Sequence, residues 1–188
     1  LGDVYKRQVL GRIKLIVHSK PGKHTPDVEY TFKDVGLKQN IPVLGLYPNY
    51  NNQITLIYTD LQGNERARSN LKLQTKTLES RRLPKEIRVV KAQYDRMEPG
   101  MNLVNSPGQD ETDTSIPYMI DADGEIRWIL DWEKSDEHRY IGIGCGLIRM
   151  QNGHYMTGDG NHHRMVEVDM MGNTIHNWDM LERGYTMH

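Results

Sequence analysis

Short stretches in which polar and apolar residues alternate dominate the first part of the chain. Residues 12–18 alternate at first, and residues 28–32 place three apolar side chains on one face of a strand. Residues 53–59 are rich in β-branched side chains, and a Gln-Gly-Asn turn then leads to a partner stretch that runs towards Leu73. Strands of this length and spacing predict a β-sandwich over residues 9–78.

A mostly apolar run at residues 41–47 is predicted as a buried strand of this sandwich. Pro42 cannot donate a hydrogen bond to a neighbouring strand, so the strand starts there or lies at an edge. Residues 48–52, Pro-Asn-Tyr-Asn-Asn, have the composition of a turn.

The pattern changes between residues 79 and 116, which are predicted to form a linker and a long loop. Basic side chains surround Pro84, and a solvated linker or edge strand explains them better than an anion site: Arg81, Arg82, Lys85 and Arg88. Residues 101–116 hold Asn, Ser, Pro, Gly, Gln, Asp and Thr in close order, which is typical of a long loop.

The last part of the chain, residues 117–188, contains an internal sequence repeat. The Asp-x-x-Gly sequence at Asp121 returns 48 residues later at Asp169, and a tryptophan in an apolar stretch follows each copy. A repeat of this size, built from short strands, predicts the start of a β-propeller. The two aspartate turns are expected on equivalent edges of adjacent blades.

Between the two copies, Asn152-Gly153 predicts a hairpin that joins residues 147–150 to residues 154–157. Because a blade buries its faces against neighbouring blades, further residues are expected downstream. The predicted fold class is therefore all-β, with an N-terminal β-sandwich followed by the first blade or blades of an incomplete β-propeller.

Both ends of the sequence are expected to be artificial. Residues 3–8, Asp-Val-Tyr-Lys-Arg-Gln, read back as GAT GTG TAT AAG AGA CAG, the end of a common transposon-based sequencing adapter. Residues 1–8 are therefore left out of the fold prediction, and the gene is expected to begin upstream, together with any export signal. The chain stops at His188 with no closing element, which predicts a truncated C-terminus.

Composition excludes several classes of partner. Lys and Arg number 24 and Asp and Glu 25, so there is no basic excess for nucleic acid or for an anionic membrane surface. No apolar run approaches the length of a membrane span. Cys145 is the single cysteine, so no disulfide forms within the chain, and its glycine-rich surroundings suit a small buried residue better than a nucleophile.

Motifs for metal or cofactor chemistry are incomplete. Asp121 opens a calcium-like loop, but Ile126 and Trp132 stand where an EF-hand has Gly and Glu, so a hairpin turn is predicted instead. Residues 158–161 are glycine-rich but lack the lysine of a P-loop and the spacing of a dinucleotide site. No zinc spacing and no nucleophile elbow occurs. No metal site, cofactor or catalytic residue is therefore predicted from the residues alone.

Histidines concentrate late in the chain, at His138, His154, His162, His163, His176 and His188. For each taken alone, a surface or packing role is predicted. Two adjacent histidines on a regular strand would point to opposite faces, so His162 and His163 are not expected to share a metal.

Two segments carry more specific sequences. Residues 41–56 contain an aliphatic-Gly-Leu-Tyr stretch followed by Asn-Gln-Ile-Thr-Leu, and residues 118–188 contain Gly-Glu-Ile-Arg-Trp-Ile-Leu-Asp, Glu-Val-Asp-Met-Met-Gly and Arg-Gly-Tyr. They resemble the N-terminal sandwich domain and the entry into the six-bladed propeller of the bacterial arylsulfate sulfotransferase family, whose members do not use a nucleotide sulfate donor.

The resemblance implies an enzyme that moves a sulfuryl group from a phenolic sulfate ester to a phenol through a sulfohistidine, in ping-pong order and without a cofactor. It implies a substrate-binding role for His188, which lies at or one place before the family's pocket histidine. The catalytic histidine lies on a later blade, so this polypeptide is expected to be inactive. The resemblance also implies a periplasmic or secreted protein that pairs as a homodimer through its N-terminal domain.

The alternative from another class is a non-catalytic sandwich–propeller module for binding or surface interaction. Channel histidines and an arginine on later blades would indicate the enzyme, whereas aromatic or acidic residues in their place would indicate the binding module.

Overall fold

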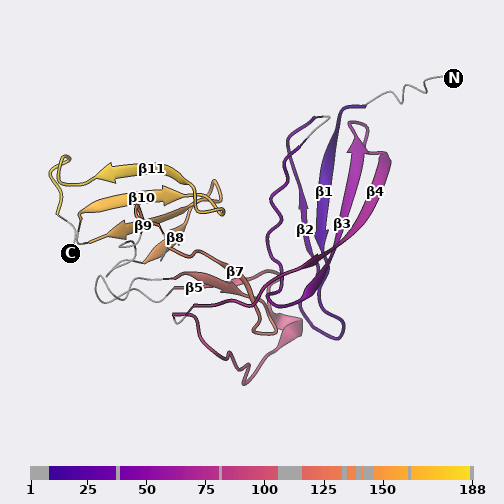
Figure 1. Cartoon of the computed structure of the whole chain (residues 1–188), viewed down its shortest axis with the longest axis horizontal. Helices are drawn as coiled ribbons and strands as arrows, with labels where there is room; N and C mark the ends of the chain where they lie inside the picture. Colours follow the sequence, from indigo (N-terminus) through magenta and orange to yellow (C-terminus); the bar gives the residue numbers. More distant parts are fainter. Residues whose placement is uncertain are drawn as a thin grey trace. The chain divides into compact units, whose positions relative to one another are not determined.

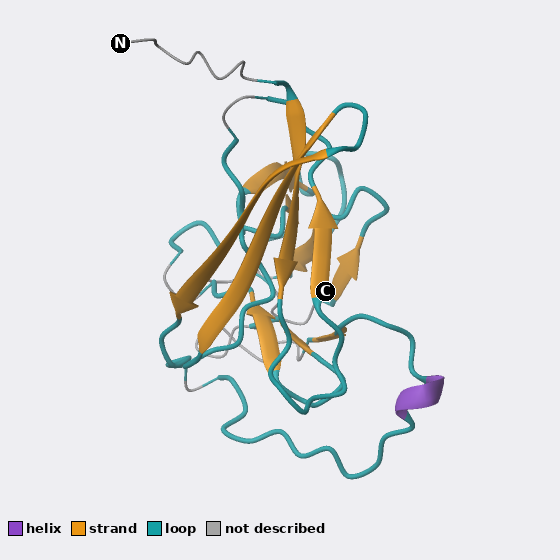
Figure 2. Ribbon diagram, turned by 90° about the vertical axis from the view of Figure 1, so that its right-hand side faces the viewer, coloured by secondary structure: helices purple, strands orange, loops and turns teal. Residues whose placement is uncertain are grey.

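The computed structural model describes residues 9–36, 39–80, 82–105, 116–132, 135–138, 141, 146–160 and 162–186. The regular structure of these residues consists of antiparallel strands and one short 3₁₀ helix, Tyr94–Arg96 (Figure 1). The predicted all-β class is confirmed, and the sheets fit a sandwich followed by the start of a propeller. Figure 2 shows the same predominance of strands and loops in a second view.

By its contacts the chain divides into two compact units. Unit 1 comprises Leu1–Leu78, Val89–Gly100 and Asp121–Arg127, and unit 2 comprises Glu79–Arg88, Met101–Ile120 and Trp128–His188. The short turn at Asp121–Arg127 thus packs with the N-terminal residues, although it is far from them in sequence.

Unit 1 contains one four-stranded antiparallel sheet in the order β2-β1-β3-β4. Its strands are β1 (Gly11–Val17), β2 (Val28–Thr31), β3 (Asn51–Asp60) and β4 (Glu65–Gln74). These strands lie where the alternation of polar and apolar residues predicted them. The central pair sets Leu15 opposite Leu56 and Val17 opposite Ile54, so their apolar side chains share one face.

The core of unit 1 forms on that face. Leu15, Val17 and Ile54 are buried, and partly buried apolar side chains pack against them: Val28, Phe32, Val43, Leu46 and Leu56. Burying one such side chain fully contributes about 1.5–3 kcal/mol, so this cluster supplies much of the stability of the sheet.

The prediction of a strand at residues 41–47 was wrong. This stretch contributes Val43 and Leu46 to the core but pairs with no described strand. The Asn52 side chain takes the place of a neighbouring strand: Tyr47 N donates to Asn52 Oδ1 at 2.8 Å, and Asn52 Nδ2 donates to Tyr47 O at 2.9 Å. Gly45, at φ 77°, bends the backbone out of the extended conformation.

Unit 2 contains a four-stranded antiparallel sheet in which each strand pairs with the next in sequence, in the order β11-β10-β9-β8. Its strands are β8 (Leu147–Arg149), β9 (Tyr155–Asp159), β10 (Arg164–Val168) and β11 (Thr174–Asp179). Such a meander is the architecture of a propeller blade. The hairpin predicted at Asn152-Gly153 joins β8 to β9 and is confirmed.

A second, three-stranded sheet has the order β5-β6-β7, with β5 (Asn102–Val104), β6 (Tyr118–Ile120) and β7 (Ile126–Ile129). The division between the units falls within β7. β5 occupies the start of the predicted long loop at residues 101–116, because Asn102–Val104 finds a pairing partner in β6. Residues 106–115 lie outside the described part of the chain.

The internal sequence repeat at Asp121 and Asp169 is a hairpin-turn motif. At Asp121 and at Asp169, the glycine three residues on donates its N–H to the aspartate carbonyl, at 3.0 and 3.1 Å. In both turns one carboxylate oxygen accepts N–H groups from the residues two and four positions on. Asp60 makes the same turn in unit 1, so the motif is not confined to the predicted propeller.

Candidate functional site

Three neighbouring strands of unit 2 have their ends side by side, and we call this row of strand ends the edge of the sheet. Arg164, the first residue of β10, pairs with Asp159 at the end of β9 and with Asp179 at the end of β11. Met180 N then donates to His163 O at 2.8 Å, so the chain leaving β11 lies against the turn between β9 and β10. Polar side chains from separate strands are therefore gathered at this edge.

A buried carboxylate, that of Asp159, organises this edge. Its Oδ2 contacts His162 Nδ1 at 2.9 Å and Arg164 Nε at 3.1 Å, and its Oδ1 accepts the backbone N–H of His162 at 3.2 Å. The Asp159 side chain is fully buried, whereas the His162 side chain is half-exposed. Asp159 thus fixes the orientation of a half-exposed imidazole and of a guanidinium that is mostly buried.

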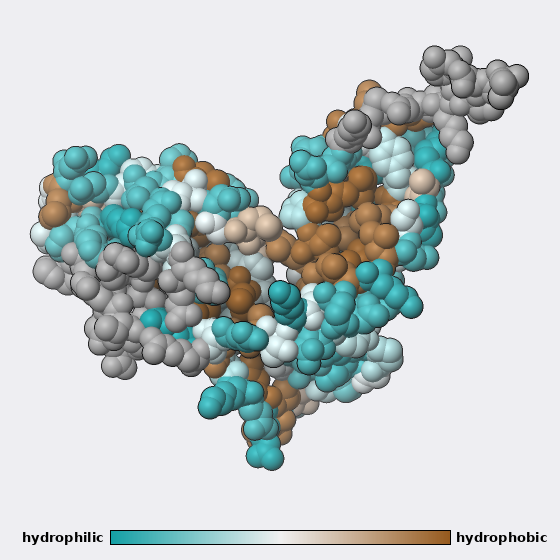
Figure 3. All heavy atoms as spheres, in the orientation of Figure 1, coloured by the Kyte–Doolittle hydropathy of each residue, from teal (hydrophilic) through white to brown (hydrophobic). Residues whose placement is uncertain are grey.

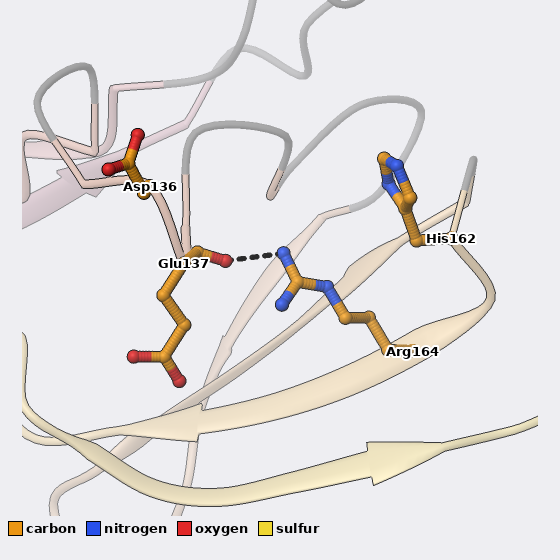
Figure 4. Close-up of a pocket in the computed structure, with 4 residues that line it drawn as sticks. All are labelled: Asp136, Glu137, His162 and Arg164. Atoms are coloured by element: carbon orange, nitrogen blue, oxygen red, sulfur yellow. Dashed lines mark hydrogen bonds between the residues drawn. The ribbon is translucent and has the colours of Figure 1, made fainter.

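His162 and Arg164 line a surface pocket of about 300 Å³ together with Asp136 and Glu137. Figure 4 shows the Arg164 guanidinium extending towards the Glu137 backbone carbonyl, to which Nη2 donates at 2.5 Å. A planar guanidinium beside an imidazole can hydrogen-bond the oxygens of a sulfate or phosphate ester. The two acidic residues on the opposite side could instead accept hydrogen bonds from a hydroxyl group.

A second cluster lies further along β10, around Glu167. This buried carboxylate contacts His154 Nδ1 at 2.6 Å and His176 Nδ1 at 2.8 Å, and it accepts a hydrogen bond from Asn152 Nδ2 at 2.9 Å. These hydrogen bonds, that from His176 first, lower the pKa of Glu167 to about 2. The carboxylate is therefore ionised at neutral pH, and it contacts the Nδ1 atom of each of the two imidazoles.

The histidines singled out from the sequence have different surroundings. His154 and His176 come together at Glu167, and His162 is held at Asp159. His138 is buried, as a packing role predicts. His162 and His163 lie in a turn, not on a strand, so the expectation of opposite strand faces does not apply to them. His188 and Cys145 lie outside the described residues.

The carboxylates that organise both clusters were missed from the sequence. Asp159 precedes His162 by three residues, a spacing at which a side chain caps the turn that follows it. Glu167 lies opposite His176 across the β10–β11 ladder only because the register shifts between Glu167 and Val168. A regular register counted from the Asp169 turn would have placed Ile175 opposite Glu167, so that reasoning would have missed the pair.

Two further properties concern the described part of the chain. Its His, Cys, Asp and Glu residues form no group of three or more suited to a metal ion. Within the same residues, none of the helical structure has the length and apolarity needed to cross a membrane.

Comparison with known families identifies the chain. The Arylsulfotransferase (ASST) family profile matches residues 86–188, and the Arylsulfotransferase Ig-like domain profile matches residues 4–76. The chain belongs to the arylsulfotransferase family. This confirms the resemblance that the sequence predicted. No individual curated protein matches the chain.

The two family matches divide the structure between two domains of the arylsulfotransferase family. The sheet β2-β1-β3-β4 falls within the Ig-like match, and both carboxylate-centred clusters fall within the Arylsulfotransferase (ASST) match. The Asp159 pocket thus lies within the residues that match the Arylsulfotransferase (ASST) profile, and it is the candidate functional site.

Proposed function

We propose that this chain is part of an arylsulfate sulfotransferase that transfers a sulfuryl group from a phenolic sulfate ester to a phenol, with no nucleotide donor and no cofactor. The observation that carries the proposal is the succession of the two family matches, the Ig-like domain at residues 4–76 and the arylsulfotransferase domain at residues 86–188.

The proposed reaction has two half-reactions. An imidazole nitrogen attacks sulfur, a nitrogen–sulfur bond forms, and the sulfur–oxygen bond to the leaving phenolate breaks. The acceptor phenol oxygen then attacks the sulfohistidine, the nitrogen–sulfur bond breaks, and the phenolic proton leaves to a base. We propose that the attacking histidine lies on a later blade and that these 188 residues alone are inactive. His188 remains a proposed substrate-binding residue.

The Asp159 pocket supplies a role for described residues in this reaction. We propose that Arg164 and His162 bind the sulfuryl oxygens, because a guanidinium and an imidazole offer several N–H donors to a sulfate ester. Asp159 would act as a positioning residue, since it contacts both side chains and is itself buried. Charge that builds on the sulfuryl oxygens would be stabilised by donors already held in place.

The test uses two polypeptides, the present chain and a longer one that continues through the remaining blades. With a chromogenic aryl sulfate as donor and phenol as acceptor, we expect transfer from the longer protein and none from the present chain. Transfer by the present chain would refute its inactivity. No transfer by the folded longer protein with any donor would favour the non-catalytic sandwich–propeller module.

A matched pair of variants of the longer protein tests the pocket. Arg164→Met should lower kcat/KM at least about 10-fold, as expected for the loss of one charged donor to a reacting oxyanion. Arg68→Met removes another arginine, one whose exposed side chain pairs with Glu65 on β4, and should leave kcat/KM unchanged. Equal kcat/KM for wild type and Arg164→Met would remove the pocket from the mechanism while leaving the family-level activity intact.

Two further proposals concern location and assembly. We propose that the protein is periplasmic or secreted, which fractionation of cells producing the longer protein would test. We also propose a homodimer formed through the N-terminal domain. Its support is an exposed apolar set on the core face of the sheet in unit 1: Tyr30 is 54%, Leu71 47% and Leu73 42% exposed. Figure 3 shows an apolar area over this sheet.

A further inference from the structure

A chain of hydrogen bonds in unit 2 links a serine to a carboxylate through a histidine. Ser135 Oγ lies 3.0 Å from His138 Nδ1, and His138 Nε2 lies 2.7 Å from Thr174 Oγ1. Thr174 Oγ1 in turn lies 3.0 Å from Glu137 Oε1. The four side chains come from the turn before β8 and from the first residue of β11.

The direction of every hydrogen bond in this chain follows from its last member. A carboxylate can only accept, so the single hydroxyl proton of Thr174 goes to Glu137. Thr174 Oγ1 must therefore accept from His138, which places the ring proton on Nε2. The lone pair of the neutral ring is then on Nδ1, and it faces the hydroxyl group of Ser135.

The environment of His138 favours this neutral form. The residue is 6% exposed, and the Trp132 indole packs against its ring with centroids 5.4 Å apart. Burial lowers the pKa of His138, because water cannot solvate a charged ring at this buried position. Ser135, in contrast, is only partly buried and is open to a reagent from solvent.

These relations are those of an activated nucleophile: a hydroxyl within reach of a base whose tautomer is fixed by a third group. We propose that Ser135 is a nucleophilic hydroxyl that takes an acyl group from activated aryl carboxylate esters, with His138 as its general base. Thr174 and Glu137 are positioning residues that hold the ring proton on Nε2. This reactivity is separate from sulfuryl transfer and belongs to the present chain.

The proposed step balances as follows. Ser135 Oγ attacks the ester carbonyl carbon, the Oγ–carbon bond forms, and the bond from that carbon to the phenolate oxygen breaks. The hydroxyl proton passes to His138 Nδ1 and from there to the leaving phenolate. The product is an acyl-serine ester and a free phenol, and water can later hydrolyse the ester.

The experiment treats the 188-residue chain with 4-nitrophenyl acetate, follows release of nitrophenolate, and locates the acetyl group by peptide mass spectrometry. We expect the label on Ser135 and its loss in Ser135→Ala, while Ser69→Ala, which removes an exposed serine from β4, keeps it. His138→Gln should slow labelling by about 100-fold or more, the usual range for a general base. Labelling of Ser135 no faster than that of Ser69 would overturn the proposal.

Because His138 is buried, the His138→Gln variant could fail to fold. Thr174 and Glu137, at the other end of the chain of hydrogen bonds, provide an independent test. Thr174→Val removes the acceptor of the His138 ring proton, and Glu137→Ala removes the acceptor of the Thr174 hydroxyl proton; both leave Ser135 and His138 in place. Both should slow acetylation of Ser135 at least about 10-fold with an unchanged circular dichroism spectrum. Unchanged labelling rates in both variants would show that the contacts only cap a turn.

Discussion

Arg127 provides the most direct test of how unit 1 is held together. Its guanidinium and the Asp121 carboxylate are fully buried, with Nη1 2.9 Å from Oδ2. Nε and Nη2 both donate to Gly45 O, at 2.9 and 2.6 Å, and the guanidinium lies 3.6 Å from the Tyr47 ring centroid. One side chain thus joins the Asp121 turn to the irregular segment that covers the core.

The expected cost of Arg127→Met follows from these contacts. Removing one partner of a buried ion pair costs about 3–5 kcal/mol, because the other charge is left buried and uncompensated. Asp121 keeps the N–H groups of Asp123 and Glu125, at 3.0 and 2.9 Å, so its carboxylate is not left bare. We therefore expect a loss of about 3 kcal/mol, the lower end of that range.

Amide hydrogen exchange on the whole chain resolves the two units. Exchange of the β1 and β3 amides should accelerate by the factor that corresponds to about 3 kcal/mol, roughly 100-fold, while that of β9 and β10 in unit 2 stays unchanged. Arg127→Lys keeps the charge but lacks the planar fork, so an intermediate loss is expected. A loss below about 1 kcal/mol for Arg127→Met would refute the reasoning, since that is the value of an exposed pair.

Two other predictions concern acid stability and assembly. Hydrogen bonds hold the pKa of Glu167 at about 2 against an ordinary 4.5, so its contribution to stability is full above pH 4.5 and is lost as the pH falls towards 2. Glu167→Gln should lower the Tm of unit 2 at pH 6 but much less at pH 3, and parallel Tm curves for the two proteins would contradict this. For the homodimer, Leu71→Lys should shift sedimentation velocity from dimer to monomer at micromolar concentration, with Lys72→Ala on the opposite face as control; a monomeric wild type would end that proposal.

The strands of unit 1 could be predicted because their side chains alternate between a buried and an exposed face. The same reasoning failed at residues 41–47, where apolar composition predicted burial but could not distinguish a strand from an irregular segment. The deciding contacts come from one side chain, Asn52, whose amide donates to and accepts from the Tyr47 backbone. An asparagine at the start of the next strand carries no signal in a hydrophobicity pattern.

The candidate site shows a different limit of prediction from the sequence. The histidines were visible in the sequence, but the carboxylates that orient them were not singled out. Glu167 meets His176 only because the β10–β11 register sets them opposite each other, and Asp159 meets His162 through a turn. Counting residues from the Asp169 turn would not have found the Glu167–His176 pair, because the strand register shifts between Glu167 and Val168.

A comparison of two aspartate turns shows why local sequence does not set the energy of an interaction. Asp60 and Asp121 each close the same turn, and each pairs with an arginine six residues on, Arg66 or Arg127. The Arg66 side chain is 52% exposed, whereas that of Arg127 is fully buried against Gly45. The Asp60 carboxylate is buried as well, but without Arg66 it keeps two backbone N–H groups and the Asn64 side chain, and the Arg66 side chain already lies half in water. Arg66→Met should therefore destabilise unit 1 less than Arg127→Met. Equal losses in the two variants would mean that the turn itself, and not the burial of the ion pair, determines the contribution of these arginines.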